Sequence, residues 1–244
     1  MIDFPIAATH HAILSASVVT SLFALAGYRL RGVSRSGAVA GFAVAFALYV
    51  SAGAGAFAVL AALFAVTFAA TRLGRQQKLH LGTAERPEGR DATQVLANVG
   101  IAALFAASYK AFGHPALLAG CAAALAEAAA DTVSSECGQA FGSHARLLTT
   151  GTRVPAGTNG GVSLAGTACG AVAALGMALV AAWAGLVGWG GLGPGIVVLA
   201  ALAGVFLDSL LGATLEGPGW LNNNAVNLAG TALAAILAAF LAGW

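Results

Sequence analysis

The sequence predicts an all-α integral membrane protein, a polytopic transmembrane helix bundle of about eight spans that forms a single domain over residues 1–244. Hydrophobic residues make up 59% of the chain and charged residues only 8%, and the mean hydropathy is +0.86. A soluble domain usually carries about 25% charged residues. The apolar residues also fall into runs long enough to cross a bilayer, and most charges lie between alternate runs.

Eight apolar segments follow one another along the chain. Their expected bounds are 8–28, 37–51, 54–71, 93–112, 115–132, 161–184, 194–214 and 225–243. Only a short Ser-Ala-Gly-Ala-Gly stretch separates the second from the third. About 35 continuous helical residues would far exceed the hydrocarbon core, so we expect a tight turn there. The N-terminal residues lack the basic start of a secretory signal, so we expect the first segment to be retained.

The basic residues predict the orientation of the bundle. With eight spans, ten of the eleven Lys and Arg residues fall in loops on one side, and only Lys110 lies opposite. The positive-inside rule makes that side cytoplasmic, with both termini outside, and we expect a bacterial inner membrane. The expected cytoplasmic loops are 29–36, 73–92, 133–160 and 215–224. Most acidic residues sort to the same side, so the active face is expected there, with Asp3 the clear exception.

Two helices carry carboxylates near this face. Glu127 and Asp131 lie four residues apart on the fifth segment, so they share one face of a helix, and Asp208 and Glu216 stand at the end of the seventh. Ionisable groups inside a span are costly and usually face a cavity or a partner. Mg²⁺ binds one or two carboxylates together with phosphate oxygens, so such a pair suits it. Hydrogen bonding between helices by protonated acids is the alternative.

The loop before the sixth segment, residues 149–163, combines four glycines with several hydroxyls and Arg153. It leads directly into a helix N-terminus, where free N–H groups and the positive end of the helix dipole favour phosphate. It is not a Walker A loop, because the Gly-Lys-Ser/Thr ending is absent. A flexible turn with a hydroxyl cap is the alternative interpretation.

An internal repeat connects this loop with the last helix. Residues 162–167 read VSLAGT and residues 226–231 read VNLAGT. Each copy opens a helix, and each follows a helix that ends in Asp-Thr or Asp-Ser. This pattern predicts a pseudo-repeat in the C-terminal half, with a site between the two helix pairs.

Several other classes of site are not indicated. The three cysteines have neither disulfide nor zinc spacing, and small buried side chains are the expected role. The five histidines are scattered without metal-ligand spacing. Lys and Arg are too sparse for a nucleic-acid interface.

As a set, the motifs resemble the DUF92 family of membrane proteins, which includes human transmembrane protein 19 and the phytyl-phosphate kinases of vitamin E synthesis. The matching pieces are residues 89–91, 94–98, 130–138, 150–155, 157–163, 208–213 and 222–227. The resemblance implies transfer of a phosphoryl group from a nucleoside triphosphate, CTP or a similar donor, to a prenyl monophosphate such as phytyl or geranylgeranyl phosphate, giving the diphosphate. Mg²⁺ is the implied cofactor, and the prenyl chain is expected among the Ala/Gly-rich helix faces.

These inferences assign a role to each candidate residue. The metal ligands are expected to be Asp131, Glu136 and Asp208, directly or through water. The catalytic residues are expected to be Asp131, Asp208 and Arg153. The residues expected to bind substrate phosphate are Lys78, Arg90, Asn98, Gly157, Thr158, Asn159, Gly160, Gly161, Ser163, Asn224 and Asn227. The four asparagines among them are expected either to hold phosphate oxygens or to orient the acids.

Two other functions use the same parts. Internal repeats with polar helix breaks are also found in transporters, so a transporter or flippase of phosphorylated lipids is one alternative. Its site would reach the middle of the bilayer, whereas the polar residues here gather at one face. A CTP-dependent nucleotidyltransferase is the other alternative, and it differs in which phosphorus is attacked.

Overall fold

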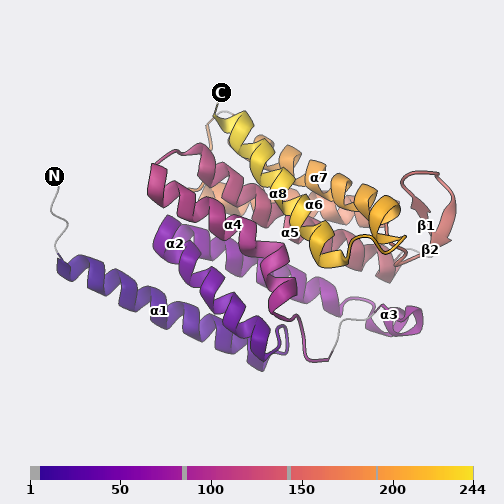
Figure 1. Ribbon diagram of the computed structural model, residues 1–244, viewed down its shortest axis with the longest axis horizontal. Helices are drawn as coiled ribbons and strands as arrows, with labels where there is room; N and C mark the ends of the chain where they lie inside the picture. Colours follow the sequence, from indigo (N-terminus) through magenta and orange to yellow (C-terminus); the bar gives the residue numbers. More distant parts are fainter. Residues whose placement is uncertain (1–5, 84–86, 142–143, 191, 244) are drawn as a thin grey trace.

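The structure, a computed structural model, describes residues 6–83, 87–141, 144–190 and 192–243. Asp3, Glu85 and Arg86, which entered the charge argument, lie outside these residues. The described chain is mostly helical, and the predicted all-α membrane bundle is confirmed (Figure 1). Its helices are α1 (Ile6–Arg29), α2 (Arg35–Arg72), α3 (Arg75–Leu81), α4 (Ala92–Phe112), α5 (Ala116–Phe141), α6 (Leu164–Trp183), α7 (Gly193–Leu211), η1 (Gly212–Glu216) and α8 (Asn223–Ala242).

Six of the described helices are long and apolar enough to cross a membrane, and α2 accounts for two of the expected segments. Gly53 interrupts α2 with φ 80° and ψ −176°, a conformation that glycine adopts without steric cost. At the C-terminal end of α2, the Arg72 guanidinium donates to the Leu30 carbonyl at 3.2 Å. Because α2 also begins directly after the α1–α2 loop, both of its ends lie beside that loop. The expected turn between the second and third segments is therefore present.

One expected boundary was wrong, and two expected loops contain secondary structure. Helix α5 continues to Phe141 instead of ending at residue 132, so residues 133–141 are helical and not part of a loop. The rest of that loop contains a small antiparallel sheet of order β2-β1-β3, formed by β1 (His144–Leu147), β2 (Arg153–Pro155) and β3 (Gly161–Val162). The short helix α3 was also not expected in its loop. Both additions satisfy backbone groups outside the spans.

Helix α5 lies at the centre of the bundle, and 83% of its most apolar 18-residue stretch is buried. Its side chains from Ala122 to Ala130 are small, apart from Leu125 and Glu127, and this lets neighbouring backbones approach closely. Gly166 and Gly170, four residues apart on α6, pack directly on α5: a Cβ at Gly166 would meet the Ser134 carbonyl oxygen at 2.6 Å. The outer helices instead expose large apolar side chains such as Val172 and Phe240, as expected for a lipid-facing surface.

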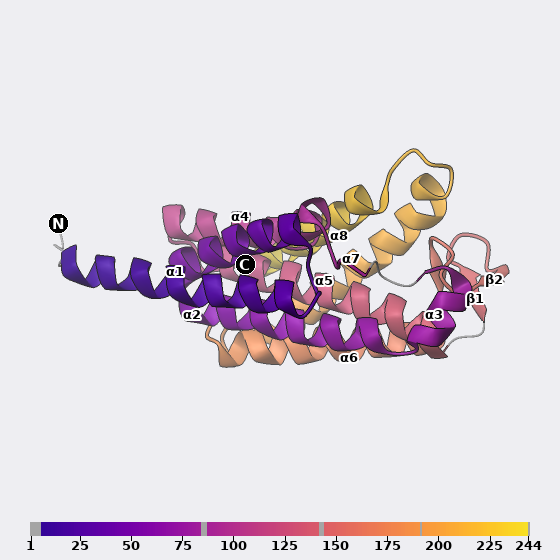
Figure 2. The ribbon, with the colours of Figure 1, turned by 90° about the horizontal axis from the view of Figure 1, so that it is seen from below.

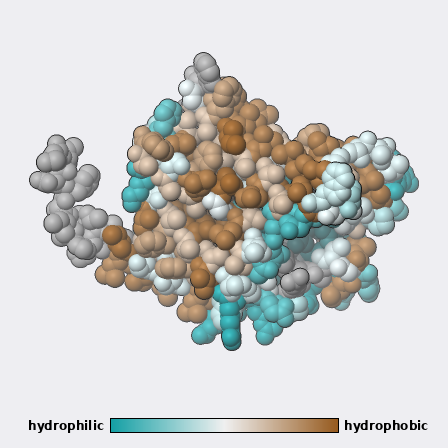
Figure 3. Space-filling view, viewed as in Figure 1, coloured by the Kyte–Doolittle hydropathy of each residue, from teal (hydrophilic) through white to brown (hydrophobic). Residues whose placement is uncertain are grey.

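The loops that connect the spans gather at two ends of the bundle. In Figures 1 and 2, α3, the small sheet and the η1–α8 connection lie together at one end, far from the N-terminus. The space-filling view shows hydrophobic residues over most of the helices and hydrophilic residues mainly toward that polar end (Figure 3). The polar face predicted from the charges is thus a real feature of the fold. Its cytoplasmic orientation, with the termini outside, stays a prediction.

The tight contact between α5, α7 and α8 gives a test of this packing. A Cβ at Gly204 would lie 2.6 Å from Glu127 Cγ and 2.6 Å from the Gly230 carbonyl oxygen. We expect Gly204→Ala to lower the free energy of unfolding by about 1–3 kcal/mol, the usual cost of overpacking. The measurement is thermal unfolding in detergent. Gly176→Ala is the control, because a Cβ there meets nothing within 4 Å; equal melting temperatures for the two variants would contradict the packing.

Candidate phosphate and metal site

A polar cavity of about 250 Å³ lies at the polar end of the bundle, between α5, α7, η1 and the loop before α6. Asp131 from α5 and Asp208 from α7 both line it, and both are half-buried. The glycine-rich loop supplies the facing wall, through residues 156–163. The structure therefore brings together the two aspartates and the loop that the sequence selected separately. Of the expected phosphate-binding residues, those lining the cavity are Gly157, Thr158, Asn159, Gly160, Gly161 and Ser163.

The glycine-rich loop keeps its shape because a larger residue does not fit at its contact with η1. Gly160 has φ +71°, and a Cβ there would lie 2.3 Å from the Ala213 backbone nitrogen. Gly212 closes the same contact from the other side, because its Cβ would meet the Gly160 nitrogen at 2.8 Å. Gly157, with φ +87°, makes the turn beside Thr83. These glycines are therefore required for close approach of two backbones, and the loop is not simply a flexible turn.

One hydroxyl and one amide side chain cap the N-termini of the helices that begin beside the cavity. Ser163 Oγ accepts from the Gly166 N–H at 3.1 Å and caps α6, so its hydroxyl is committed to that helix. Asn222 caps α8 in the same way, accepting from the Ala225 N–H at 2.9 Å. Asn224 reaches across to α4 and donates to Thr93 Oγ1 at 3.1 Å. Asn224 thus joins two helices and does not line the cavity.

A chain of amides leads from α4 to Asp208. In the orientation that satisfies both of its polar atoms, the Asn227 amide donates to Asp208 Oδ2 at 3.2 Å and accepts from Asn98 Nδ2 at 3.2 Å. Asn98 also donates to the Gln94 carbonyl at 2.8 Å. Asn98 and Asn227 therefore orient Asp208, one of the two roles considered for them. The other, direct contact with phosphate oxygens, is left to the residues that line the cavity.

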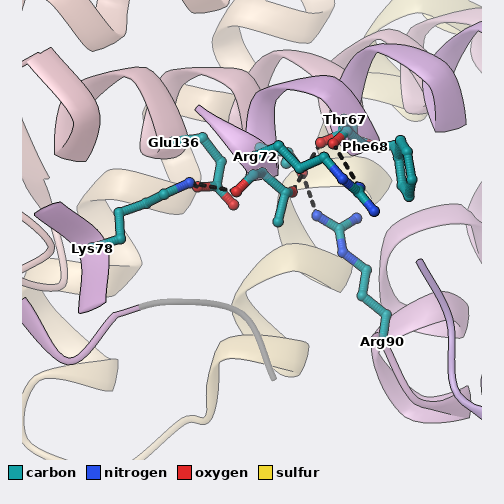
Figure 4. Close-up of polar contacts among 8 residues, drawn as sticks. Thr67, Phe68, Arg72, Lys78, Arg90 and Glu136 are labelled. Carbon is teal, nitrogen blue, oxygen red and sulfur yellow. Dashed lines mark hydrogen bonds and ion pairs between the residues drawn. The ribbon is translucent and has the colours of Figure 1, made fainter. Parts of the chain in front are cut away.

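Three further candidate residues, Lys78, Glu136 and Arg153, also lie away from the cavity. Lys78 is almost fully buried and pairs with Glu136 at 2.5 Å, and its ammonium also donates to the Thr71 carbonyl at 2.6 Å (Figure 4). Neither residue lines the polar cavity. Arg153 is exposed on β2, opposite Arg146 of β1. The expected roles of Lys78 in phosphate binding, Glu136 in metal binding and Arg153 in catalysis therefore have no counterpart in this geometry.

Arg90 lies behind the cavity, not in it. Its guanidinium donates to Thr132 Oγ1 at 3.4 Å, on the residue next to Asp131. Its backbone is fixed by pairing with the α1–α2 loop, because Ser34 N–H donates to the Arg90 carbonyl at 2.9 Å. Arg90 therefore holds a positive charge close to the carboxylates without entering their cavity.

The donor set fits some metal arrangements and not others. Within the described chain, no group of three or more His, Cys, Asp or Glu side chains is arranged to hold a metal ion. Asp131, Asp208 and Glu216 are the carboxylates that line the cavity, and Mg²⁺ takes one or two carboxylates when substrate phosphate supplies further oxygens. The residues present thus suit a metal that arrives with a phosphate ligand.

Several residues that line the cavity were not among the predicted site residues, although Glu216 and Ser135 stood out by their helical spacing from the aspartates. Glu216 lines it from η1, and Ser134, Ser135 and Ser209 add hydroxyls. The spacing of Glu216 from Asp208 was visible, but the π-helical turn that places Glu216 was not. The serines could have been found by extending α5 beyond residue 132, since Ser135 follows Asp131 at helical spacing.

Comparisons with known proteins identify the family of the chain. The family described as "Integral membrane protein DUF92" matches residues 18–235, and the chain belongs to that family. The resemblance inferred from the motifs is thereby confirmed. No solved structure matches the chain.

Curated relatives come from bacteria, plants and archaea. An uncharacterized membrane protein of Synechocystis is 35% identical over 187 residues, which are 75% of this chain and 72% of that protein. Protein VTE6, chloroplastic, of Arabidopsis thaliana is 32% identical over 218 residues, covering 85% of this chain but only 64% of VTE6. An uncharacterized membrane protein of Methanocaldococcus jannaschii is 38% identical over 152 residues, or 61% of this chain and 60% of that protein.

The buried ion pair predicts a loss of stability, not of substrate affinity, when it is broken. Lys78→Met leaves the Glu136 carboxylate without its partner, and removing one member of a buried pair costs about 3–5 kcal/mol. We expect a clear drop in the melting temperature in detergent. The double variant Lys78→Met/Glu136→Leu removes both charges and is expected to recover most of it. An unchanged melting temperature in Lys78→Met would contradict a structural role.

The loop contact predicts a local effect of Gly160→Ala. The added Cβ clashes with Ala213, so the loop is expected to leave η1 and expose the chain near Arg146 and Arg153 to trypsin. Gly151→Ala is the matched control, because Gly151 has φ +68° but a Cβ there meets nothing within 4 Å. Both substitutions place an alanine at a positive φ, and this left-handed conformation costs about 1–2 kcal/mol in either variant. Faster cleavage is expected only for Gly160→Ala; equal rates would show that the contact does not hold the loop.

Proposed function

We propose that this protein is a membrane prenyl-phosphate kinase, which transfers a phosphoryl group from a nucleoside triphosphate to a prenyl monophosphate. The observation that carries the proposal is the polar cavity in which Asp131 and Asp208 face a glycine-rich loop at one end of a lipid-embedded bundle. Its motifs resemble those of the phytyl-phosphate kinases, and VTE6 is among its relatives. CTP or a similar triphosphate is the proposed donor.

The chain's own groups can position the triphosphate and its metal ion. Backbone N–H groups of the loop at 157–161, other than those of Thr158 and Gly161, which donate within the loop, and the N-terminus of α6 favour the triphosphate, because both present positive dipoles to anions. Asp131 and Asp208 would hold Mg²⁺ together with phosphate oxygens, and the bound ion would neutralise charge on the transferred group. Asn227, by its hydrogen bond to Asp208, orients that carboxylate.

The reaction needs little proton chemistry from the protein. An oxygen of the prenyl monophosphate attacks the γ-phosphorus, the bond from that phosphorus to the β–γ bridging oxygen breaks, and the nucleoside diphosphate leaves with the electron pair. The attacking phosphate oxygen is already anionic, so no strong base is required. Catalysis then consists of alignment and charge neutralisation.

The position of the cavity favours an enzyme over a transporter or flippase. The cavity is lined by loop residues and by the ends of α5 and α7, whereas a transporter site lies near the middle of the bilayer. A CTP-dependent nucleotidyltransferase would use the same cavity, and the position of the label in the donor separates the two reactions.

We expect purified protein with Mg²⁺ and γ-labelled CTP or ATP to label geranylgeranyl or phytyl monophosphate. Asp131→Asn and Asp208→Asn are expected to lower the rate at least about a hundredfold, the scale on which losing one electrostatic contact to the transition state lowers kcat. Glu88→Gln is the control, because Glu88 is exposed and does not line the cavity.

Each outcome decides between functions. Label from an α-labelled donor appearing in the lipid would indicate a nucleotidyltransferase. No transfer with either labelled donor, together with transbilayer movement of the lipid monophosphate in vesicles, would indicate a transporter and overturn the kinase. Full activity in Asp131→Asn and Asp208→Asn would move the active site away from the polar cavity.

A further inference from the structure

A second cavity, of about 110 Å³, lies between α1, α2, α4 and α5. Along the helices it is lined by apolar side chains, among them Phe23, Leu60, Phe64 and Val99. Its remaining lining comes from the polar ends of the same helices. These polar residues are Arg31, Thr67, Thr71, Arg72, Arg90, Gln94 and Asn98. The cavity is therefore amphipathic along its length, with apolar walls inside the bundle and three arginines at the loop end.

The apolar walls are held by aromatic packing. The Phe23 ring meets Phe64 edge to face, with centroids 5.4 Å apart, and meets Phe57 in the same manner at 5.3 Å. Phe64 in turn stacks on Phe68 with centroids 5.5 Å apart. These ring–ring contacts fix the phenylalanine side chains in place, so the rings do not turn into the cavity beside them. The walls are thus preformed for an apolar chain.

Among the described residues, the Arg72 guanidinium has no carboxylate partner and is fixed by other contacts. It lies 3.3 Å above the centre of the Phe68 ring and donates to the carbonyls of Phe68 and Leu30 at 3.3 and 3.2 Å. Figure 4 shows the guanidinium groups of Arg72 and Arg90 pointing toward one another. A phosphate at this end of the cavity would accept charge-assisted hydrogen bonds from the arginines that line it.

Arg31 and Arg90 are placed by unusually close backbone packing. Arg31 has φ +58°, the only positive φ at a non-glycine among the described residues. A Cβ at Gly89 would lie 2.7 Å from the Arg31 carbonyl oxygen, and one at Gly37 would lie 2.1 Å from the Arg90 carbonyl oxygen. Strained or crowded backbone that persists in a fold is concentrated at functional sites. Here it brings arginines from two loops to one cavity end.

The arginine end of this cavity borders the polar cavity lined by Asp131 and Asp208, which is called the carboxylate cavity from here on. Arg90 donates to Thr132, whose neighbour Asp131 lines the carboxylate cavity. Asn98 lines the second cavity and bonds to Asn227, which bonds to Asp208. The arginine end is therefore linked to Asp131 through Thr132 on α5, and to Asp208 through the Asn98–Asn227 pair.

We propose that the second cavity binds the lipid substrate as a prenyl monophosphate, with its phosphate at Arg31, Arg72 and Arg90 and its first isoprenoid units between α1, α2 and α4. This rests on the proposed function for the identity of the substrate. Charge selects the occupant: three cations favour a phosphate headgroup, and apolar walls favour the chain attached to it. The nucleotide is left to the glycine-rich loop, so the two phosphate-bearing substrates approach from different cavities.

Direct binding tests the proposal without turnover. Radiolabelled geranylgeranyl monophosphate and isopentenyl monophosphate are titrated onto the purified protein in detergent, with no triphosphate present. Gly41 borders the cavity, and a Cβ there meets nothing within 4 Å, so Gly41→Leu is expected to extend into the cavity without a backbone clash. It is expected to weaken geranylgeranyl monophosphate binding at least about tenfold and to leave isopentenyl monophosphate binding unchanged.

Removing the charge has the complementary effect. Arg72→Gln is expected to weaken binding of both monophosphates at least about tenfold, because each loses a charge-assisted hydrogen bond. Binding of uncharged geranylgeraniol is expected to stay unchanged in that variant. Gly100→Leu is the matched control for Gly41→Leu: Gly100 is a helical glycine of α4 with open space around it, but it does not line the cavity.

The outcomes separate this proposal from the kinase. If Gly41→Leu and Gly100→Leu bind geranylgeranyl monophosphate equally, or Arg72→Gln binds it as the unaltered protein does, the assigned cavity is wrong even where transfer is observed. If both effects appear but no phosphoryl transfer occurs, the lipid site stands and the kinase fails. Equal competition by dioleoyl phosphatidate would overturn selection of a prenyl chain, because the site would then take any anionic lipid.

Discussion

The close packing of α5 against its neighbours is the constraint on which the rest of the structure depends. Apolar burial gains little inside a membrane, so helices associate through close contact of small side chains and backbones. Helix α5 meets this condition with its alanines, and its neighbours meet it with glycines such as Gly166, Gly204 and Gly230. Glu127 lies where three helices meet, with its carboxylate against Gly230 and its Cγ against Gly204. Any larger residue at these glycines would separate the helices.

This central position makes α5 the common wall of two cavities. Adjacent residues on a helix point about 100° apart, so neighbours in sequence can face different neighbours in space. Asp131 lines the carboxylate cavity, while the next residue, Thr132, accepts a hydrogen bond from Arg90 at the second cavity. Adjacent positions of one helix therefore face the two cavities. Under the proposed function, the two phosphate-bearing substrates would bind on different sides of α5.

Much of this arrangement was predictable from the sequence. The spacing of apolar runs and the sorting of charges predicted the number of segments, the turn near Gly53 and the polar end of the bundle. Composition determines these features because the bilayer tolerates few charges and requires apolar spans of a fixed length. The repeat around Asp131 and Asp208 also selected two residues that line one cavity. The motifs identified the family.

The tertiary structure decided which polar residues meet. Lys78 and Glu136 are far apart in sequence, and only the docking of α3 against α5 shows that they neutralise each other. In the sequence, Arg31 and Arg72 are typical of charges that orient a membrane protein. The fold of α2 brings both of them to the polar end of the second cavity. Sequence alone determined that this protein lies in a membrane with its polar groups at one end, because those properties depend on composition and local spacing. Which charges pair and which remain available to a substrate was decided only by the tertiary structure, because it depends on contacts between distant segments.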